Sequence, residues 1–176
     1  MRTLRGGFFL LAVVAVCLTA TLPALGQTDR WVDDDTCPAI GTGEENDPYC
    51  KIQDAICELK DISGGGTVHV NPGYYNEAIR FFPRVSVKST DGPEVTTIDA
   101  TGRPCTTSAC VECTENLTCA VVVWGSGSGN DDRLEGFRIT GGAGLFRSNP
   151  DEGNGIAGGG IFVFDSSPTI TENEIT

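Results

Sequence analysis

Cysteines carry the most informative chemistry in this chain of 176 residues. Eight are present, and those at positions 37 and 50 bracket a turn-rich loop. In an exported chain, thiols at such spacing form disulfides, which restrict the unfolded loop. We therefore predict a Cys37–Cys50 bridge. Two further bridges are predicted within a second group, which comprises Cys105, Cys110, Cys113 and Cys119.

Two questions about the cysteines stay open at this stage. Pairing within the second group does not follow from its spacing. Cys57 is predicted to be a free, partly buried thiol, unless it takes the place of Cys37 or Cys50 in their bridge. The second group also resembles a plant-type ferredoxin spacing, but its fourth member follows too soon, and an exported chain is a poor carrier of an iron–sulfur cluster.

Carboxylates near the N-terminus offer oxygen ligands. Asp33, Asp34 and Asp35 are consecutive, and Ca²⁺ prefers such ligands. Their spacing fits no EF-hand, and aspartates in loops commonly accept bonds from nearby backbone N–H groups. We expect no cofactor, with a weak Ca²⁺ site in this loop as the alternative.

A set of polar residues is predicted to face outward from strands. Such a surface can hold a sugar chain when aromatic faces lie nearby. The predicted ligand face comprises His69, Lys88, Asp99 and Arg138, and the candidate stacking rings are Tyr74, Tyr75 and Trp124.

No catalytic set is recognisable. His69 is the only histidine, so no Ser/His/Asp triad is available, and Gly64–Gly66 precedes a strand instead of opening a helix, unlike a phosphate loop. Arg138 near Asp131 and Asp132 is the closest approach to a lyase site. The pKa of arginine is too high for a base, so we expect Arg138 to pair with an acid on a neighbouring coil.

The charge balance is strongly acidic. The formal net charge is −12, and it is −14 without the two arginines of the leader described next. Nucleic acids and anionic membranes would be repelled, so neither is an expected partner.

Residues 1–26 have the pattern of a secretory signal. Arg2 and Arg5 precede the apolar run Phe8–Leu18, and small residues lead to predicted cleavage after Gly26. Bulky Val16 disfavours lipid attachment at Cys17. We expect the protein to be secreted, periplasmic or at the cell surface, and to be a monomer. Asn116-Leu-Thr118 is a glycosylation acceptor only in a eukaryote.

Residues 65–102 set the architecture expected for the chain. Apolar and polar residues alternate there, which is typical of strands with one buried face. The predicted strands are Trp31-Val32, Thr67–Val70, Glu77–Phe81, Val85–Ser89, Thr96–Ala100, Ala120–Trp124, Leu134–Thr140, Gly160–Phe164 and Thr169–Thr176, with a long flexible loop at Gly141–Gly159.

One helix is predicted, at Lys51–Lys60. Its apolar stripe consists of Ile52, Ala55, Ile56 and Leu59. We expect Asp47 or the residues around Tyr49 to cap it, and we expect the helix to cover the open end of a strand stack.

An internal echo favours a repeating stack. Leu134-x-x-Phe137-x-Ile139 matches Ile170-x-x-Asn173-x-Ile175 at an offset of 36 residues. Short strands without intervening helices are typical of a solenoid, a sandwich or a barrel. We favour the solenoid over the sandwich, and the chain looks interrupted at Thr176. The expected organisation is a signal at 1–26, a cap at 27–63, and coils at 64–176 with a Cys-rich insertion at 103–119.

Two passages resemble the secreted right-handed parallel β-helix proteins of the pectin-lyase-like superfamily. Their N-terminal cap and first coils are similar to Cys50–Ile56 with Gly64–Gly73, Tyr75, Glu77 and Thr97–Asp99, and a later coil repeat is similar to Gly158–Ile175. The resemblance implies three parallel sheets wound into a coil, with Asn173 at an inward corner where amides can stack.

The first passage also resembles pectin methylesterases in Ile-Gln-x-Ala-Ile and Pro-Gly-x-Tyr-x-Glu, but their catalytic motifs are absent. The expected function is a non-catalytic module that binds extracellular polysaccharide or serves as a scaffold. The alternative is the N-terminal part of a polysaccharide lyase, esterase or glycosidase whose active site lies in later coils.

Overall fold

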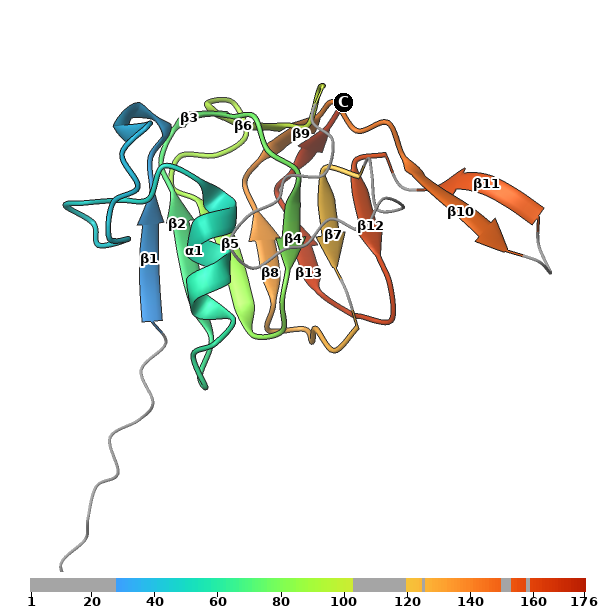
Figure 1. Cartoon of the computed structure of the whole chain (residues 1–176), viewed down its shortest axis with the longest axis horizontal. Coiled ribbons are helices and arrows are strands. Elements are labelled where there is room, and N and C mark those ends of the chain that lie inside the picture. The colour runs from blue at the N-terminus through green and yellow to red at the C-terminus, as the bar shows by residue number, and fades with distance from the viewer. Residues whose placement is uncertain (1–27, 103–119, 125, 150–152, 158) are drawn as a thin grey trace, which may run out of the picture.

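The computed structural model describes residues 28–102, 120–124, 126–149, 153–157 and 159–176. Three sheets of parallel strands form the body of this part of the chain (Figure 1). The five-stranded sheet has the order β1 (Thr28–Val32), β2 (Gly66–Val70), β5 (Val85–Ser89), β8 (Arg133–Glu135) and β13 (Thr169–Thr171). The four-stranded sheet has the order β14 (Glu174–Ile175), β9 (Arg138–Thr140), β6 (Thr96–Asp99) and β3 (Gly73–Tyr75). The three-stranded sheet has the order β12 (Ile161–Val163), β7 (Val122–Trp124) and β4 (Ile79–Phe81).

The chain visits these three sheets in rotation. Strands β2, β3 and β4 are followed by β5, β6 and β7, and then by β8, β9 and β12. Each strand pairs in parallel with its counterpart from the preceding pass. The prediction of an all-β architecture is confirmed, and the antiparallel pairing expected of a sandwich does not occur in these sheets.

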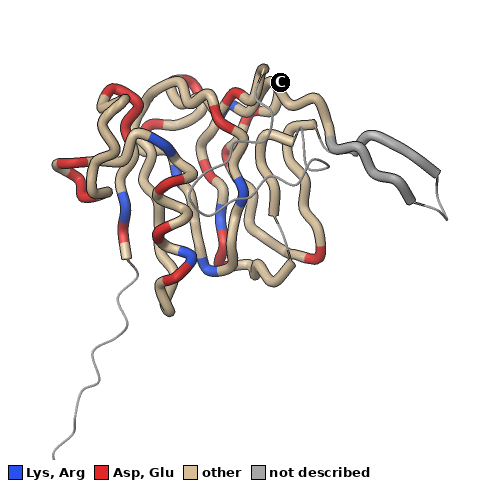
Figure 2. The backbone as a smooth tube through the Cα atoms, viewed as in Figure 1, with Lys and Arg blue, Asp and Glu red and all other residues tan. Residues whose placement is uncertain are grey.

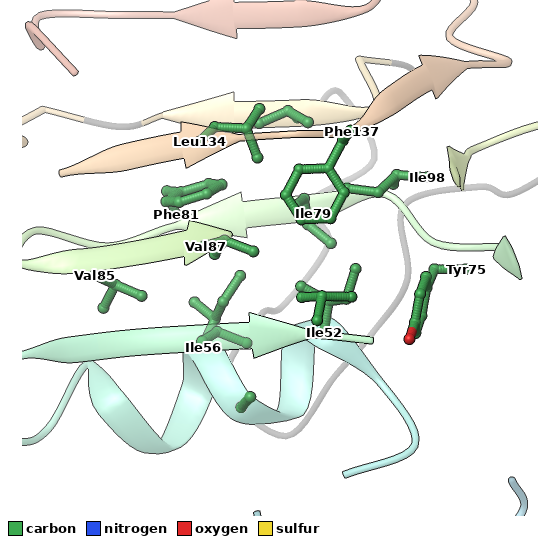
Figure 3. Packing of buried hydrophobic residues seen from close by; sticks show 14 of the residues in the cluster. Ile52, Ile56, Tyr75, Ile79, Phe81, Val85, Val87, Ile98, Leu134 and Phe137 are labelled. Carbon is green, nitrogen blue, oxygen red and sulfur yellow. The ribbon is translucent and has the colours of Figure 1, made fainter. Parts of the chain in front are cut away.

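The register aligns apolar residues from successive passes. Val68, Val87 and Leu134 are aligned on the five-stranded sheet, and all three are fully buried. On the three-stranded sheet the rings of Phe81 and Trp124 stack with centroids 4.0 Å apart. Figure 3 shows Val87, Leu134 and Phe81 among the apolar side chains that converge between the sheets. Parallel pairing therefore builds one continuous core from segments distant in sequence.

The internal echo corresponds to adjacent strands. Ile170 pairs with Leu134 and Ile175 with Ile139. Asn173 lies at the corner between β13 and β14, where its Oδ1 accepts from the Phe137 N–H at 2.9 Å and its Nδ2 donates to the Leu134 carbonyl at 2.9 Å. The amide thus binds the backbone of the preceding pass, because the residue at the matching position there is Phe137 and offers no amide for stacking.

Replacing Asn173 with alanine is expected to loosen this corner without unfolding the protein. The Phe137 N–H loses its only side-chain acceptor in the described structure. Its hydrogen exchange should accelerate about tenfold, equivalent to ~1.4 kcal/mol of local opening. Exchange measured by NMR checks this, with the Gly66 N–H as an internal reference because it bonds to the Arg84 carbonyl in the first pass. Equal protection of Phe137 in both proteins would contradict the role of Asn173.

Helix α1 (Ile52–Leu59) covers one end of the core. It packs against β1, β2 and β4 (Figure 1). The four residues of the predicted apolar stripe are all fully buried, which confirms that prediction. The predicted capping residues are wrong, because Lys51 is the N-cap residue and makes no side-chain cap. The carboxylate of Glu77 instead accepts from the N–H groups of Ile52 and Gln53.

Several predicted strand limits change where the chain turns a corner. The predicted strand Leu134–Thr140 is divided into β8 and β9 at Gly136, whose φ of +83° favours glycine. The predicted strand at Glu77 begins only at Ile79, because the Glu77 side chain is directed to the helix. Strand β3, which includes Tyr74 and Tyr75, was not predicted as a strand.

The long flexible loop predicted at Gly141–Gly159 is also wrong. It contains β10 (Leu145–Asn149) and β11 (Gly153–Ala157), which pair antiparallel. Figure 1 shows this pair extending away from the three sheets. Glycine-rich composition suggested a loop, whereas the backbone of this segment pairs with itself.

The disulfide predictions have mixed outcomes. Cys37 and Cys50 are bonded, with Cα atoms 5.0 Å apart, which confirms the first bridge. Cys57 is also disulfide-bonded, so the prediction of a free thiol is wrong. Since Cys37 and Cys50 bond each other, the partner of Cys57 lies outside the described residues. The signal at 1–26 and the insertion at 103–119, with Cys105, Cys110, Cys113, Cys119 and Asn116, lie outside them too.

Candidate functional site

The outward face of the five-stranded sheet brings two predicted ligand residues together. Parallel register aligns Trp31, His69, Lys88 and Glu135 in one row across β1, β2, β5 and β8. The rings of Trp31 and His69 stack with centroids 4.7 Å apart and planes 23° apart. His69 Nε2 lies 3.3 Å from Asp29 Oδ1. The row therefore combines an aromatic pair with a neighbouring cation.

Ion pairs hold the charged end of this row. Glu135 lies 3.2 Å from Arg133 and 3.9 Å from Lys88. Pairs of this exposure contribute little stability. Figure 2 shows basic and acidic residues interspersed along the strands. We call Trp31, His69, Lys88, Arg133 and Glu135 the sheet face.

The other two predicted ligand residues lie on the four-stranded sheet. Asp99 is only 7% exposed, accepts from the Thr101 N–H, and bonds to the hydroxyl of Tyr74. It is a structural acceptor and not part of an open surface. Arg138 pairs with Glu174 on the adjacent strand at 3.1 Å, which confirms its predicted pairing with an acid of a neighbouring pass. The four predicted residues thus divide between two sheets.

Two of the three aromatic residues predicted for stacking are unavailable to a ligand. Tyr75 and Trp124 are buried in the core, because both occupy inward positions of their strands. Tyr74 alternates with Tyr75 and is 56% exposed. The period-two pattern itself identifies which of the two tyrosines is exposed, once Gly73–Tyr75 is recognised as a strand.

Two of the three aspartates of the predicted Ca²⁺ loop, Asp33 and Asp34, are engaged with protein groups. Asp33 Oδ1 accepts from the Asp35 N–H, and Asp33 Oδ2 accepts from Asn71 Nδ2. Asp34 Oδ2 accepts from the Tyr74 N–H at 2.9 Å, and burial followed by the charge of Asp33 raises the pKa of Asp34. Within the described residues, no group of three or more His, Cys, Asp or Glu side chains is placed to hold a metal ion. The Asx-type turn is the arrangement found.

Glu77 is a buried carboxyl group of the kind used in acid–base chemistry, and its sequence pattern did not identify it. It is 6% exposed, and burial raises its pKa to about 7, although the bonds from the N–H groups of Gln53 and Ile52 oppose that rise. A carboxyl group with such a pKa is suited to acid–base chemistry when its oxygens are open. Here one oxygen accepts from Ile52 and the other from Gln53, so its evident role is to hold helix α1.

A second charged cluster lies in the cap. Both Nε and Nη2 of Arg30 bond to the Glu58 carboxylate at 2.6 Å, and the Tyr49 hydroxyl donates to it at 2.8 Å. The bond from Arg30 holds the pKa of Glu58 below its usual value, and burial raises the pKa of Tyr49 to about 12. A hollow of about 450 Å³ beside Tyr49 and Glu58 has a mixed lining, in which Asp54 and Asp61 lie together with Ile40, Cys57 and Lys60.

In the described residues, Arg138 and Asp132 do not form the arginine–aspartate pair that the sequence offered as the closest approach to a lyase site. Arg138 pairs with Glu174, as described, while Asp132 is buried and accepts from the Gly129 N–H at 3.0 Å. Burial raises the pKa of Asp132. Its carboxylate is committed to its own turn and is not paired with Arg138.

A smaller hollow lies at the corner between the five- and four-stranded sheets. Its volume is about 280 Å³, and its lining includes Asp34, Lys51, Tyr74, Asn76 and Glu77 together with the Cys37–Cys50 disulfide. We call it the corner pocket. Gly73 approaches Asp34 so closely that a Cβ there would lie 2.1 Å from Asp34 Oδ1.

Among the helices that the structure describes, none has the length and apolar character needed to cross a membrane. Comparisons with models of protein families, with curated proteins and with solved structures find no match for this chain.

Proposed function

We propose that this chain is a secreted, non-catalytic module of right-handed parallel β-helix form that binds an extended extracellular polysaccharide along the sheet face. The rotation of the chain through three parallel sheets supports a coil. The Cys37–Cys50 disulfide supports an oxidising compartment, and the leader at 1–26 supports export. The module acts as a monomer, and it binds neither nucleic acid nor a membrane.

One observation carries the binding function: the row of Trp31, His69, Lys88 and Glu135 across four strands. Neighbouring parallel strands are about 4.8 Å apart. A row of four therefore spans roughly 14 Å, which suits an elongated chain of sugar rings. The aromatic pair offers an apolar surface to C–H faces, and the charged groups offer partners to hydroxyls.

The alternative is a polysaccharide-active enzyme, and the observation that favours it is the state of the Glu77 carboxyl group. Its raised pKa is that of a general acid, and it lines the corner pocket. Against this role, both carboxylate oxygens accept backbone N–H groups. We therefore assign Glu77 to the fold. Release of reducing ends, assayed separately on the polymers named below, would support the alternative.

The test is affinity electrophoresis of the folded protein in gels containing a neutral β-glucan, a xylan or a galacturonan. The His69→Ala/Lys88→Ala double variant should bind the preferred polymer about tenfold more weakly, equivalent to ~1.4 kcal/mol. Lys60→Ala is the matched control, because its ammonium pairs with exposed Asp61 in the cap. Absence of binding to every polymer, or unchanged binding by the double variant, would contradict the proposal.

A further inference from the structure

The corner pocket has the composition of a site for a single sugar ring. Tyr74 supplies a half-exposed aromatic face, and Asp34, Lys51 and Asn76 supply hydrogen-bonding groups of both kinds around it. Its volume of about 280 Å³ lies near the lower end of ligand pockets, which start at roughly 300 Å³. The pocket therefore suits one ring and not an extended chain.

Tyr74 is held in place at both ends. Its N–H donates to Asp34 Oδ2 at 2.9 Å, and its hydroxyl bonds to the buried carboxylate of Asp99. Asn76 supports the same corner, because its Nδ2 donates to the Asp99 carbonyl at 2.8 Å. A ring fixed in this way loses little conformational freedom on binding, which favours weak but specific stacking.

The surrounding charges select the class of ligand. Two carboxyl groups, those of Asp34 and Glu77, line the pocket together with one ammonium group, that of Lys51. The whole chain carries a net charge of −12. An anionic sugar would meet this excess of negative charge, whereas hydroxyl groups can donate to Asp34 and accept from Lys51.

From this arrangement we propose that the corner pocket is a subsite for one neutral hexopyranose, whose apolar face lies against Tyr74. The subsite deepens the proposed polysaccharide function and rests on it for biological context. It is distinct from the sheet face, because it is built from β3 and the residues that follow it, the turn after β1 and the N-cap residue of helix α1. One sugar of a polymer would enter it at a corner of the coil.

The probes are free glucose, galactose and mannose, with galacturonate as the charged comparison, each titrated to high millimolar concentration and followed by NMR. Amide shifts are expected at Lys51, Tyr74 and Asn76 for a neutral hexose. Tyr74→Ala should weaken the interaction about 2- to 10-fold, as expected for loss of one stacking ring. Tyr74→Phe keeps the ring and should stay within about twofold of the wild type.

The controls separate this subsite from the sheet face. A monosaccharide cannot span the sheet face, so the His69→Ala/Lys88→Ala variant should keep the shifts of the corner pocket. Lys51→Met should weaken binding of the neutral hexose. The fold should stay intact, because Lys51 is exposed and its side chain does not cap helix α1. The amide spectrum of each variant verifies folding.

Three results would overturn the subsite: no shift at these residues with any neutral hexose, equal affinity in Tyr74→Ala, or tighter binding of galacturonate. Absence of polymer binding by the wild type, or unchanged polymer binding by His69→Ala/Lys88→Ala, would instead reject the sheet face, and retained monosaccharide shifts would leave the subsite standing. The two proposals therefore fail separately.

Discussion

Replacing Gln53 with alanine is expected to lower the free energy of unfolding by about 2–3 kcal/mol. The side chain of Gln53 is 2% exposed. Its Oε1 accepts from the Arg80 N–H at 2.7 Å, and its Nε2 donates to the Arg80 carbonyl at 3.2 Å. Strand β4 is the edge strand of the three-stranded sheet, and the Gln53 amide supplies the two bonds that a further strand would make. Alanine leaves both backbone groups without this partner.

A second substitution separates hydrogen bonding from packing. Gln53→Met keeps nearly the same volume and removes both bonds, so it should cost nearly as much as alanine. Urea unfolding followed by circular dichroism measures the free energy of unfolding of the wild type, Gln53→Ala and Gln53→Met. Ile62, a partly buried apolar residue beyond the helix, provides the comparison, because Ile62→Val removes one methylene group and should cost only about 0.5–1.5 kcal/mol. A methionine variant as stable as the wild type would show that the Arg80 bonds contribute nothing.

Periodicity explains why much of the fold was predictable. Val85–Ser89 alternates in sequence, and the structure forms a strand with those limits. The helix was predicted within one residue at each end, because its apolar stripe has helical spacing. The 36-residue echo predicted equivalent elements in successive or next-but-one coils, and the structure places Ile170 directly beside Leu134 on the adjacent strand.

What the sequence did not reveal depends on contacts between distant residues. Glu77 alternates like a strand residue, yet its side chain caps a helix that begins 25 residues earlier in the chain. Gln53 looks like a polar position of an amphipathic helix, yet it is buried against β4. Asp99 was predicted to face outward, and the hydroxyl of Tyr74 covers it. Composition and spacing do not reveal which polar side chains contact each other between distant segments. The sequence therefore predicted only part of the candidate sites.

Replacing Glu77 with glutamine is expected to change how stability depends on pH. Burial raises the pKa of Glu77 to about 7 from an ordinary value of 4.5. A carboxyl group with a raised folded-state pKa contributes stability that is fully present below the unfolded pKa and is lost as pH rises through the folded pKa. The wild type should therefore lose up to about 3 kcal/mol relative to Glu77→Gln between pH ~4.5 and pH ~7.

Stability falls as Glu77 ionises because the folded protein must hold the carboxylate anion away from water. Two N–H donors at the start of helix α1 offset part of this cost, and the pKa of about 7 already includes their effect. Glutamine keeps one acceptor oxygen for the helix without a charge, so its own stability should show no slope from this position. Glu77→Ala is the severe variant, because it removes the acceptors of Ile52 and Gln53 together, and it should be destabilised at every pH.

Glu58 provides a control of opposite sign. The bond from Arg30 lowers its pKa, so its contribution is present above the unfolded pKa and is lost as pH falls through the folded pKa. The stability of the wild type minus that of Glu58→Gln should therefore rise with pH, whereas the same difference for Glu77→Gln should fall. Urea midpoints between about pH 3 and about pH 8 measure both differences, because the Glu58 difference changes below its ordinary pKa of 4.5 and the Glu77 difference changes between pH ~4.5 and pH ~7. A flat difference for Glu77→Gln would mean that the carboxylate is as well solvated at the start of the helix as it is in the unfolded chain.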